Sequence, residues 1–246
     1  MVIVMNVDQE SGVTKRLKTG IPGLDRIIAG GIPINSQVLI LGGPGTGKTL
    51  MTLEILYHNA RLERPTTFIT TEETAEDIIE NATNAFYAFE DFSDLVDKKL
   101  IHIVHKPIIE EFKGRENFQK FVADDVIGVV NENKSSIVVF DSMSSLRPVM
   151  DSDRTYTRAI TYMTEAFKSE NITAFITAEA TPERVLVSDT GLYGTSMFDG
   201  LIKLAVNQSN GSAQYLIEIS KLRNSSHRLS NVPYQITSSG VNILAD

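Results

Sequence analysis

The sequence contains no cysteine among its 246 residues, and it has no long hydrophobic run. The absence of cysteine excludes disulfide bonds, thiolate metal sites and a cysteine nucleophile. No apolar run approaches the roughly 18 residues that a membrane-spanning helix needs. Residues 1–11 also lack the basic flank and the cleavage site of a secretory signal. We therefore expect a cytoplasmic protein that does not enter a membrane.

Positive charge is scarce as well. The chain has 23 Lys and Arg residues against 31 Asp and Glu residues, which gives a formal net charge of −8. This balance disfavours a broad cationic surface of the kind that neutralises many nucleic-acid phosphates. Lys15, Arg16 and Lys18 form one small basic cluster near the N-terminus. We therefore expect no nucleic-acid partner.

The chain also lacks any Pro-, Gly- or Ser-rich stretch that is long enough to link two domains. Its length is sufficient for one large α/β core. We predict a flexible N-terminal arm over residues 1–14 and a single domain over residues 15–246.

Strand and helix signals alternate along most of the sequence. Short apolar or β-branched runs predict strands at Gln37–Leu41, Thr66–Thr70, Leu100–Val104, Ile137–Phe140 and Ala174–Thr177. Helical patterns occupy Lys48–Ala60, a segment that begins near Thr74, Asn117–Val130 and Arg154–Lys168. The alternation predicts an α/β fold with a mostly parallel, twisted sheet and helices on both faces.

The C-terminal part of the sequence has a different character. Strand signals at Leu201–Val206 and Gln214–Ser220 flank Asn210-Gly211, which is a strong hairpin signal. A second pair, Tyr234–Thr237 and Val241–Leu244, is separated by a short turn. We therefore predict that the sheet ends in antiparallel C-terminal strands.

A phosphate-binding motif lies between the first predicted strand and helix. The segment Gly42-Gly43-Pro44-Gly45-Thr46-Gly47-Lys48-Thr49 fits the spacing G-x-x-x-x-G-K-[ST] without a mismatch. Backbone N–H groups of such a loop surround phosphate oxygens, and the positive end of the following helix adds its dipole. We expect Lys48 to reach the β- and γ-phosphates of ATP and the Thr49 hydroxyl to ligate Mg²⁺. A dinucleotide-binding loop is disfavoured, because Lys48 falls where that motif needs its third glycine.

Carboxylates follow two of the other predicted strands. Asp141 ends the strand Ile137–Phe140, and with a P-loop upstream we expect it to orient the water shell of Mg²⁺. Without the P-loop, an aspartate at this place would more commonly form a cap or a turn. Glu72 and Glu73 follow Thr66–Thr70 and are candidates for a general base that activates water. On the residue pattern alone they could instead complement the dipole of the helix that follows.

Several motifs together carry a family resemblance. They are Thr19-Gly20-Ile21-Pro22-Gly23-Leu24-Asp25, Gly30-Gly31-Ile32-Pro33, the P-loop, Glu72-Glu73, Asp141-Ser142 and Lys221-Leu222-Arg223-Asn224-Ser225-Ser226-His227. The chain resembles the KaiC-type branch of the RecA superfamily of ATPases. Its length fits one such domain, so it is similar to the single-domain archaeal relatives. The resemblance implies a RecA-like P-loop NTPase fold.

The resemblance also assigns roles to residues. It makes Glu72 the glutamate that activates water, and it makes Lys221 and Arg223 cations that reach the nucleotide of a neighbouring subunit. This implies a homo-oligomeric ring, usually a hexamer, with ATP at the subunit interfaces. The alternative for Lys221 and Arg223 is a solvated strand end. Asn224 replaces the usual glycine of the segment, and asparagine tolerates the left-handed conformation.

A looser resemblance over Leu192–Leu204 places Thr195 and Ser196 where the clock protein of this family is autophosphorylated. Capping or turn roles are the alternative for these hydroxyls. Together the signals predict an ATPase that acts as a regulatory or signalling switch on an unidentified protein partner. The rivals are a DNA-recombination ATPase, which acidic residues within Met150–Arg158 and Pro182–Gly194 disfavour, and a slow-turnover scaffold for a motor or receptor.

Overall fold

The computed structural model describes residues 14–85, 89–108, 118–180, 195–209 and 212–245. The predicted arm over residues 1–14 therefore lies almost wholly outside the described residues. None of the helices in these ranges is long and apolar enough to cross a membrane.

A nine-stranded sheet forms the centre of the molecule, with the strand order β11-β10-β9-β8-β3-β7-β6-β4-β5. The pairs from β8 to β5 are parallel, and the pairs from β8 to β11 are antiparallel. The strands are β3 (Gln37–Gly42), β4 (Thr66–Thr70), β5 (Ile101–His105), β6 (Ile137–Asp141), β7 (Thr173–Glu179), β8 (Gly200–Ser209), β9 (Ser212–Leu222), β10 (Val232–Thr237) and β11 (Gly240–Ile243). The predicted fold class is thereby confirmed, including the antiparallel C-terminal strands.

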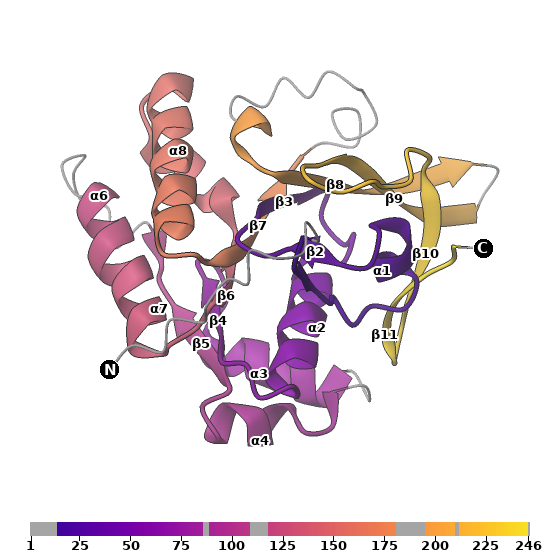
Figure 1. The fold of residues 1–246 in the computed structure, drawn as a ribbon, viewed down its shortest axis with the longest axis horizontal. Coiled ribbons are helices and arrows are strands. Elements are labelled where there is room, and N and C mark those ends of the chain that lie inside the picture. Colours follow the sequence, from indigo (N-terminus) through magenta and orange to yellow (C-terminus); the bar gives the residue numbers. More distant parts are fainter. Residues whose placement is uncertain (1–13, 86–88, 109–117, 181–194, 210–211, 246) are drawn as a thin grey trace.

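Helices cover both faces of the sheet, as Figure 1 shows. One face carries α2 (Lys48–Ala60), α3 (Ala75–Ala85) and α4 (Phe92–Asp97). The other carries α8 (Asp153–Ser169) and the run formed by α6 (Phe118–Lys120), the π-helix Phe121–Gly128 and α7 (Val129–Glu132). Two hydrophobic clusters fill these layers, which explains why β3 and β4 are buried along their whole length.

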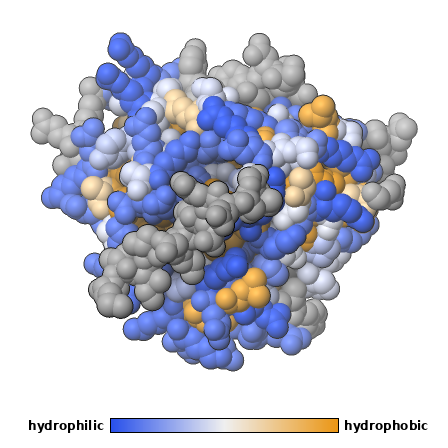
Figure 2. Space-filling view, viewed as in Figure 1, coloured by the Kyte–Doolittle hydropathy of each residue, from blue (hydrophilic) through white to orange (hydrophobic). Residues whose placement is uncertain are grey.

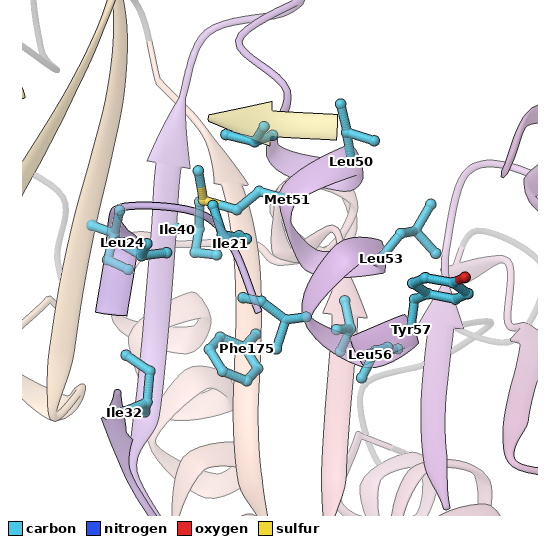
Figure 3. Packing of buried hydrophobic residues seen from close by; sticks show 14 of the residues in the cluster. Ile21, Leu24, Ile32, Ile40, Leu50, Met51, Leu53, Leu56, Tyr57 and Phe175 are labelled. Carbon is cyan, nitrogen blue, oxygen red and sulfur yellow. The ribbon is translucent and has the colours of Figure 1, made fainter. Parts of the chain in front are cut away.

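The helix α2 is held firmly against the sheet. Its Met51 and Leu56 are fully buried and pack over Ile40 of β3 and Phe175 of β7 (Figure 3). Burial of each such side chain contributes about 1.5–3 kcal/mol to stability. Because α2 begins at Lys48, this packing also fixes the position of the loop that precedes it.

The predicted helix over Asn117–Val130 differs in its geometry. Its described part is π-helical over Phe121–Gly128. The buried pairs Phe121-Val122 and Val126-Ile127 recur at a spacing that suits the i→i+5 turn of a π-helix, which brings residues five apart onto one face. The sequence reading also missed the small sheet β1 (Arg16–Leu17) and β2 (Ile32–Pro33), the helix α1 (Leu24–Ile27) and the 3₁₀ turns Met143–Val149 and Thr195–Met197.

The surface has a mixed character. On the face drawn in Figure 2, hydrophilic residues dominate and hydrophobic residues lie in small separate groups. Among the described residues, the large hydrophobic side chains that are exposed are Ile34, Leu62, Leu229 and Leu244. Leu229 is the most exposed of them, at 81%.

Candidate active site

The P-loop connects β3 to α2 at the carboxyl end of the sheet. Gly47 adopts the left-handed conformation, with φ of 81°, and precedes the first residue of α2. Within the loop, Gly43 O accepts hydrogen bonds from Thr46 Oγ1 at 2.8 Å and from Lys48 Nζ at 3.0 Å. The Lys48 ammonium group is therefore held against the loop. The backbone N–H groups of such a loop form a concave site for an anion.

Lys48 lies in a strongly acidic neighbourhood. Its side chain is largely buried, and burial lowers the pKa of the ammonium group, while the charges of Glu179, Asp141 and Glu72 act to raise it. These three carboxylates follow or end the strands β7, β6 and β4. Parallel strands bring their carboxyl ends to one edge of a sheet, so the P-loop and the carboxylates meet there.

Asp141 is joined directly to the P-loop helix. Thr49 Oγ1 donates a hydrogen bond of 2.6 Å to Asp141 Oδ2, and the Thr177 hydroxyl on β7 donates to Oδ1. Burial raises the pKa of the Asp141 carboxyl, and both hydroxyl donors act to lower it. The peptide bond from Asp141 to Ser142 is cis.

The donor set at this point fits Mg²⁺. A hydroxyl and a carboxylate already lie within 2.6 Å of each other, and both are oxygen ligands of the kind that Mg²⁺ prefers. Within the described ranges, no group of three or more His, Cys, Asp or Glu side chains could hold a metal by itself. An ion bound by Thr49 and Asp141 would thus take its remaining ligands from water and phosphate oxygens, which is the usual arrangement for Mg²⁺.

Glu72 points towards the same strand end. Its Oε1 accepts a hydrogen bond of 2.8 Å from the hydroxyl of Ser142. The N-terminus of α3 is capped by another residue, because the Thr74 hydroxyl accepts from the backbone N–H of Asp77 at 3.1 Å and donates to its carboxylate at 2.7 Å. Glu72 is therefore not needed as a cap and is oriented towards the P-loop side.

Glu73 lies in a different position from its neighbour. Its Oε2 accepts a long hydrogen bond of 3.4 Å from Asn81 Nδ2 of α3. Burial raises the pKa of Glu73, and the charge of Asp141 adds to this effect. Both glutamates thus lie near Asp141. Of the two, Glu72 is the one whose carboxylate accepts a hydrogen bond from Ser142, the residue after Asp141.

A pocket of about 350 Å³ opens beside the P-loop. It is lined by Gly45, Gly47, Lys48, Thr49, Leu50, Leu53, Glu73, Ile78, Asn81, Ala82 and Ile236. Its polar end is therefore formed by the loop, and its apolar end by α2, α3 and β10. Such a pocket can hold a flat apolar group whose charged end lies on the P-loop.

Lys221 and Arg223 lie far from the P-loop of their own chain. Arg223 donates to Asp199 Oδ1 at 3.2 Å, and Asp199 Oδ2 accepts from the backbone N–H of Gln37, the first residue of β3. The P-loop begins at Gly42, the last residue of that strand, so the length of the strand, roughly 17 Å, separates the two places. Lys221 Nζ donates to the carbonyl groups of Ser196 and Phe198 at 3.1 and 2.7 Å.

Thr195 and Ser196 belong to the same end of the sheet as these cations. They form a short 3₁₀ turn, and the Ser196 carbonyl accepts from both Lys221 and Arg223. Ser196 is exposed and Thr195 half-buried. Asn224 has φ of 57°, so it adopts the left-handed conformation that its place in the motif requires.

Several residues that contact the site were not predicted from the sequence. Thr177 and Glu179 lie at the end of β7, between the P-loop strand and the strand of Asp141. Their position after a buried strand next to the P-loop strand was a signal that could have found them. Tyr234, whose hydroxyl donates to the carbonyl of Thr46 at 2.6 Å, carried no signal in the sequence, because this contact joins residues 188 positions apart.

The chain is similar to known proteins over most of its length. A family model described as the KaiC ATPase matches residues 17–246. The circadian clock oscillator protein KaiC of Parathermosynechococcus lividus is 30% identical over 237 residues, which are 94% of this chain and 42% of that protein. The UPF0273 protein of Thermotoga maritima is 28% identical over 241 residues, with 92% of this chain and 95% of that protein covered.

A solved structure shows the same fold. The KaiC-like protein PH0186 of the hyperthermophilic archaeon Pyrococcus horikoshii superposes with a TM-score of 0.81 at 26% identity, covering 95% of this chain and 100% of that one. The chain spans less than half the length of the clock protein and nearly the whole length of the UPF0273 protein. Because the family model covers most of the sequence, the chain belongs to the KaiC family of ATPases.

Proposed function

We propose that this chain binds Mg-ATP at the P-loop and hydrolyses it. The observation that carries the proposal is the junction of Thr49, Asp141 and Glu72 at one edge of the sheet. Thr49 and Asp141 are joined at 2.6 Å, and Glu72 is joined at 2.8 Å to the residue that follows Asp141. A phosphate cradle, a pair of metal ligands and a base are the parts that phosphoryl transfer to water requires.

Each residue has a defined part in binding. The backbone N–H groups of Gly43, Gly45, Thr46 and Gly47, in the loop that Pro44 stiffens, surround the β-phosphate, and the ammonium group of Lys48 bridges the β- and γ-phosphates. Thr49 and Asp141 would hold Mg²⁺, which would neutralise phosphate charge. The adenine base occupies the apolar part of the pocket between α3 and β10.

Glu72 acts on the attacking water. Its carboxylate accepts a proton from the water as the oxygen bonds to the γ-phosphorus, and the bond from that phosphorus to the bridging oxygen of ADP breaks. The hydrogen bond from Ser142 fixes the carboxylate for this step. Glu73 lines the pocket beside Lys48, so its role is to shape the site next to the base.

The position of Lys221 and Arg223 supports action in trans. They lie at the opposite end of β3 from their own P-loop, yet the Arg223 side chain is 51% exposed and can face another molecule. In a homo-oligomeric ring, proposed to be a hexamer, each pair would stabilise charge on the γ-phosphate of the adjacent subunit.

Autophosphorylation is a second candidate activity, favoured by the contact of both cations with the Ser196 carbonyl. A hydroxyl of Thr195 or Ser196 would attack the γ-phosphorus of the neighbour's ATP, transfer its proton to a base and release ADP. Mass spectrometry after incubation with Mg-ATP tests this. A gain of one phosphate at either residue, absent in Lys48→Ala, is the expected result.

The biological role proposed here is a cytoplasmic regulatory or signalling switch, formed by one domain over residues 15–246, that acts on a protein partner. Phosphate release from Mg-ATP tests the central activity. Steady turnover supports an ATPase, whereas tight binding without turnover indicates a nucleotide-dependent scaffold. Salt-sensitive, ATP-dependent binding to single-stranded DNA would favour the recombination alternative.

A further inference from the structure

The C-terminal hairpin contacts the P-loop and its helix at successive points. Tyr234 of β10 donates to the Thr46 carbonyl at 2.6 Å, and the Val241 N–H of β11 donates to Glu54 of α2 at 2.9 Å. In Figure 3 a C-terminal strand, drawn in yellow, passes beside the first turn of α2 near Leu50. The hairpin is thus part of the surroundings of the phosphate loop.

The hydroxyl of Tyr234 is suited to donate a lasting hydrogen bond to the Thr46 carbonyl. The residue is 2% exposed, and its ring lies 5.2 Å from that of Tyr215, its partner on β9. Burial raises the pKa of the Tyr234 hydroxyl, so it stays protonated throughout the physiological range. A buried carbonyl that lost this donor would be left without its hydrogen bond, which is costly.

This contact determines the direction of a backbone donor. The carbonyl of Thr46 and the N–H of Gly47 belong to one planar trans peptide, and in such a peptide the two bonds point in opposite directions. When Tyr234 holds the carbonyl on the side of β10, the Gly47 N–H points into the loop. The accepted hydrogen bond also polarises the peptide, which strengthens the N–H as a donor to an anion.

Gly47 needs such a restraint because glycine peptides reorient easily. Its φ of 81° lies in the left-handed region, which glycine enters as readily as the right-handed one. Ile236 closes the remaining space, since a Cβ on Gly47 would lie 2.8 Å from Ile236 Cδ1. Tyr234 and Ile236, separated by one residue on β10, therefore hold the same peptide by a hydrogen bond and by packing.

We propose that Tyr234 is a positioning residue of the phosphate site, which holds the Thr46–Gly47 peptide so that the Gly47 N–H faces the bound phosphates. The inference rests on the proposed function, because it requires nucleotide on the P-loop. Without the hydroxyl, the loop spends part of its time with this N–H turned away. The apparent affinity then falls in proportion to the competent fraction.

The test compares two substitutions that each remove one hydroxyl from the same pair of rings. Tyr234→Phe removes the donor to the loop. Tyr215→Phe is the matched control, because among the described residues its hydroxyl makes no hydrogen bond to the loop. Calorimetry with Mg-ADP, at a temperature where both variants are folded, is expected to show affinity about three- to thirtyfold weaker for Tyr234→Phe and unchanged for Tyr215→Phe.

A spectroscopic readout separates positioning from a general loss of stability. With ADP at saturation, the ³¹P resonance of the β-phosphate is expected to shift in Tyr234→Phe and to match the wild type in Tyr215→Phe. Affinity within twofold of the wild type with an unchanged resonance would overturn the inference. Equal weakening in both variants would overturn it too, since it would indicate a general effect on the sheet. If the wild-type chain fails to bind Mg-ADP, the proposed function falls, and the inference falls with it.

Discussion

The hydroxyl of Ser142 donates a hydrogen bond of 2.8 Å to Oε1 of Glu72, and this bond joins the ends of β6 and β4 beside the P-loop. We therefore expect Glu72→Gln to retain Mg-ATP binding while phosphate release falls by about 10²-fold or more, the range for loss of a general base. An amide keeps the size of the side chain but cannot take the proton from water. Calorimetry and a phosphate-release assay on the same preparation check both parts.

Glu73→Gln is the matched control for this prediction. It makes the same change one residue away, on a side chain whose hydrogen bond runs to Asn81 of α3. We expect a clearly smaller loss of turnover. If Glu73→Gln proves the slower enzyme, the roles of the two glutamates are the reverse of those proposed.

Lys48→Ala is expected to abolish tight Mg-ATP binding without unfolding the chain. The Lys48 ammonium group contacts the Gly43 carbonyl and is surrounded by carboxylates, so it contributes to the site and little to the hydrophobic packing of α2. Calorimetry measures binding, and urea unfolding without nucleotide measures stability. Wild-type affinity in the variant would show that the loop does not bind the phosphates.

Much of the fold could be predicted because local signals agreed with each other. The glycine loop, the helix formers after it and the apolar runs predicted α2 with its bounds of Lys48–Ala60, and β4 at Thr66–Thr70. Asp141 and Glu72 could be proposed for the site since parallel strands end on one side. The φ of Asn224 was likewise confirmed, because asparagine tolerates that conformation.

The remaining features depend on packing between distant parts of the chain. The contact of Tyr234 with Thr46 depends on the sheet, because the Tyr234 side chain of β10 lies in the same buried cluster as α2, which begins beside Thr46. The π-helix over Phe121–Gly128 follows from the spacing of buried residues, which a reading at the α-helical period did not recognise. The separation of Arg223 from its own P-loop likewise needs the register of β3, β8 and β9.

Glu54 gives a prediction about pH. Its carboxyl is buried in α2 and accepts a hydrogen bond from the Val241 N–H, and burial raises its pKa from 4.5 to about 7. The folded state therefore keeps the proton to a higher pH than the unfolded state does. This preference for the protonated carboxyl contributes its full free energy of stabilisation below pH 4.5. The contribution is lost as the pH rises through about 7.

We expect Glu54→Gln to remove this dependence, because glutamine can still accept from Val241 but carries no charge. The variant should exceed the wild type by up to about 3 kcal/mol at pH 8 and by about 1 kcal/mol or less at pH 5. Urea unfolding at both pH values measures the difference. Glu76→Gln, on the exposed surface of α3, is the control and should follow the wild type. Parallel curves for wild type and Glu54→Gln would contradict the prediction.

The assignment of Arg223 to a neighbouring site leads to a prediction about assembly. An Arg223→Ala chain should fold, because Lys168 still pairs with Asp199 at 3.0 Å. It keeps Lys48, Thr49 and Glu72, so it still binds ATP and lacks only the cation that it would offer to its neighbour. A Glu72→Gln chain has the opposite defect, since it lacks the base but presents an intact Arg223. Each variant alone should be nearly inactive.

Co-expression of these two variants should recover part of the wild-type rate. Where Glu72→Gln presents its Arg223 to an Arg223→Ala neighbour, that interface holds one intact copy of the base and of the cation. The mixed assembly, with Glu72→Gln subunits in excess, is compared with each variant alone at the same total concentration, because co-assembly is the condition for rescue. Recovery supports a site shared between subunits in a ring. No recovery, together with a monomer mass in ATP by light scattering, would refute action in trans and leave Arg223 as a partner of Asp199 within its own chain.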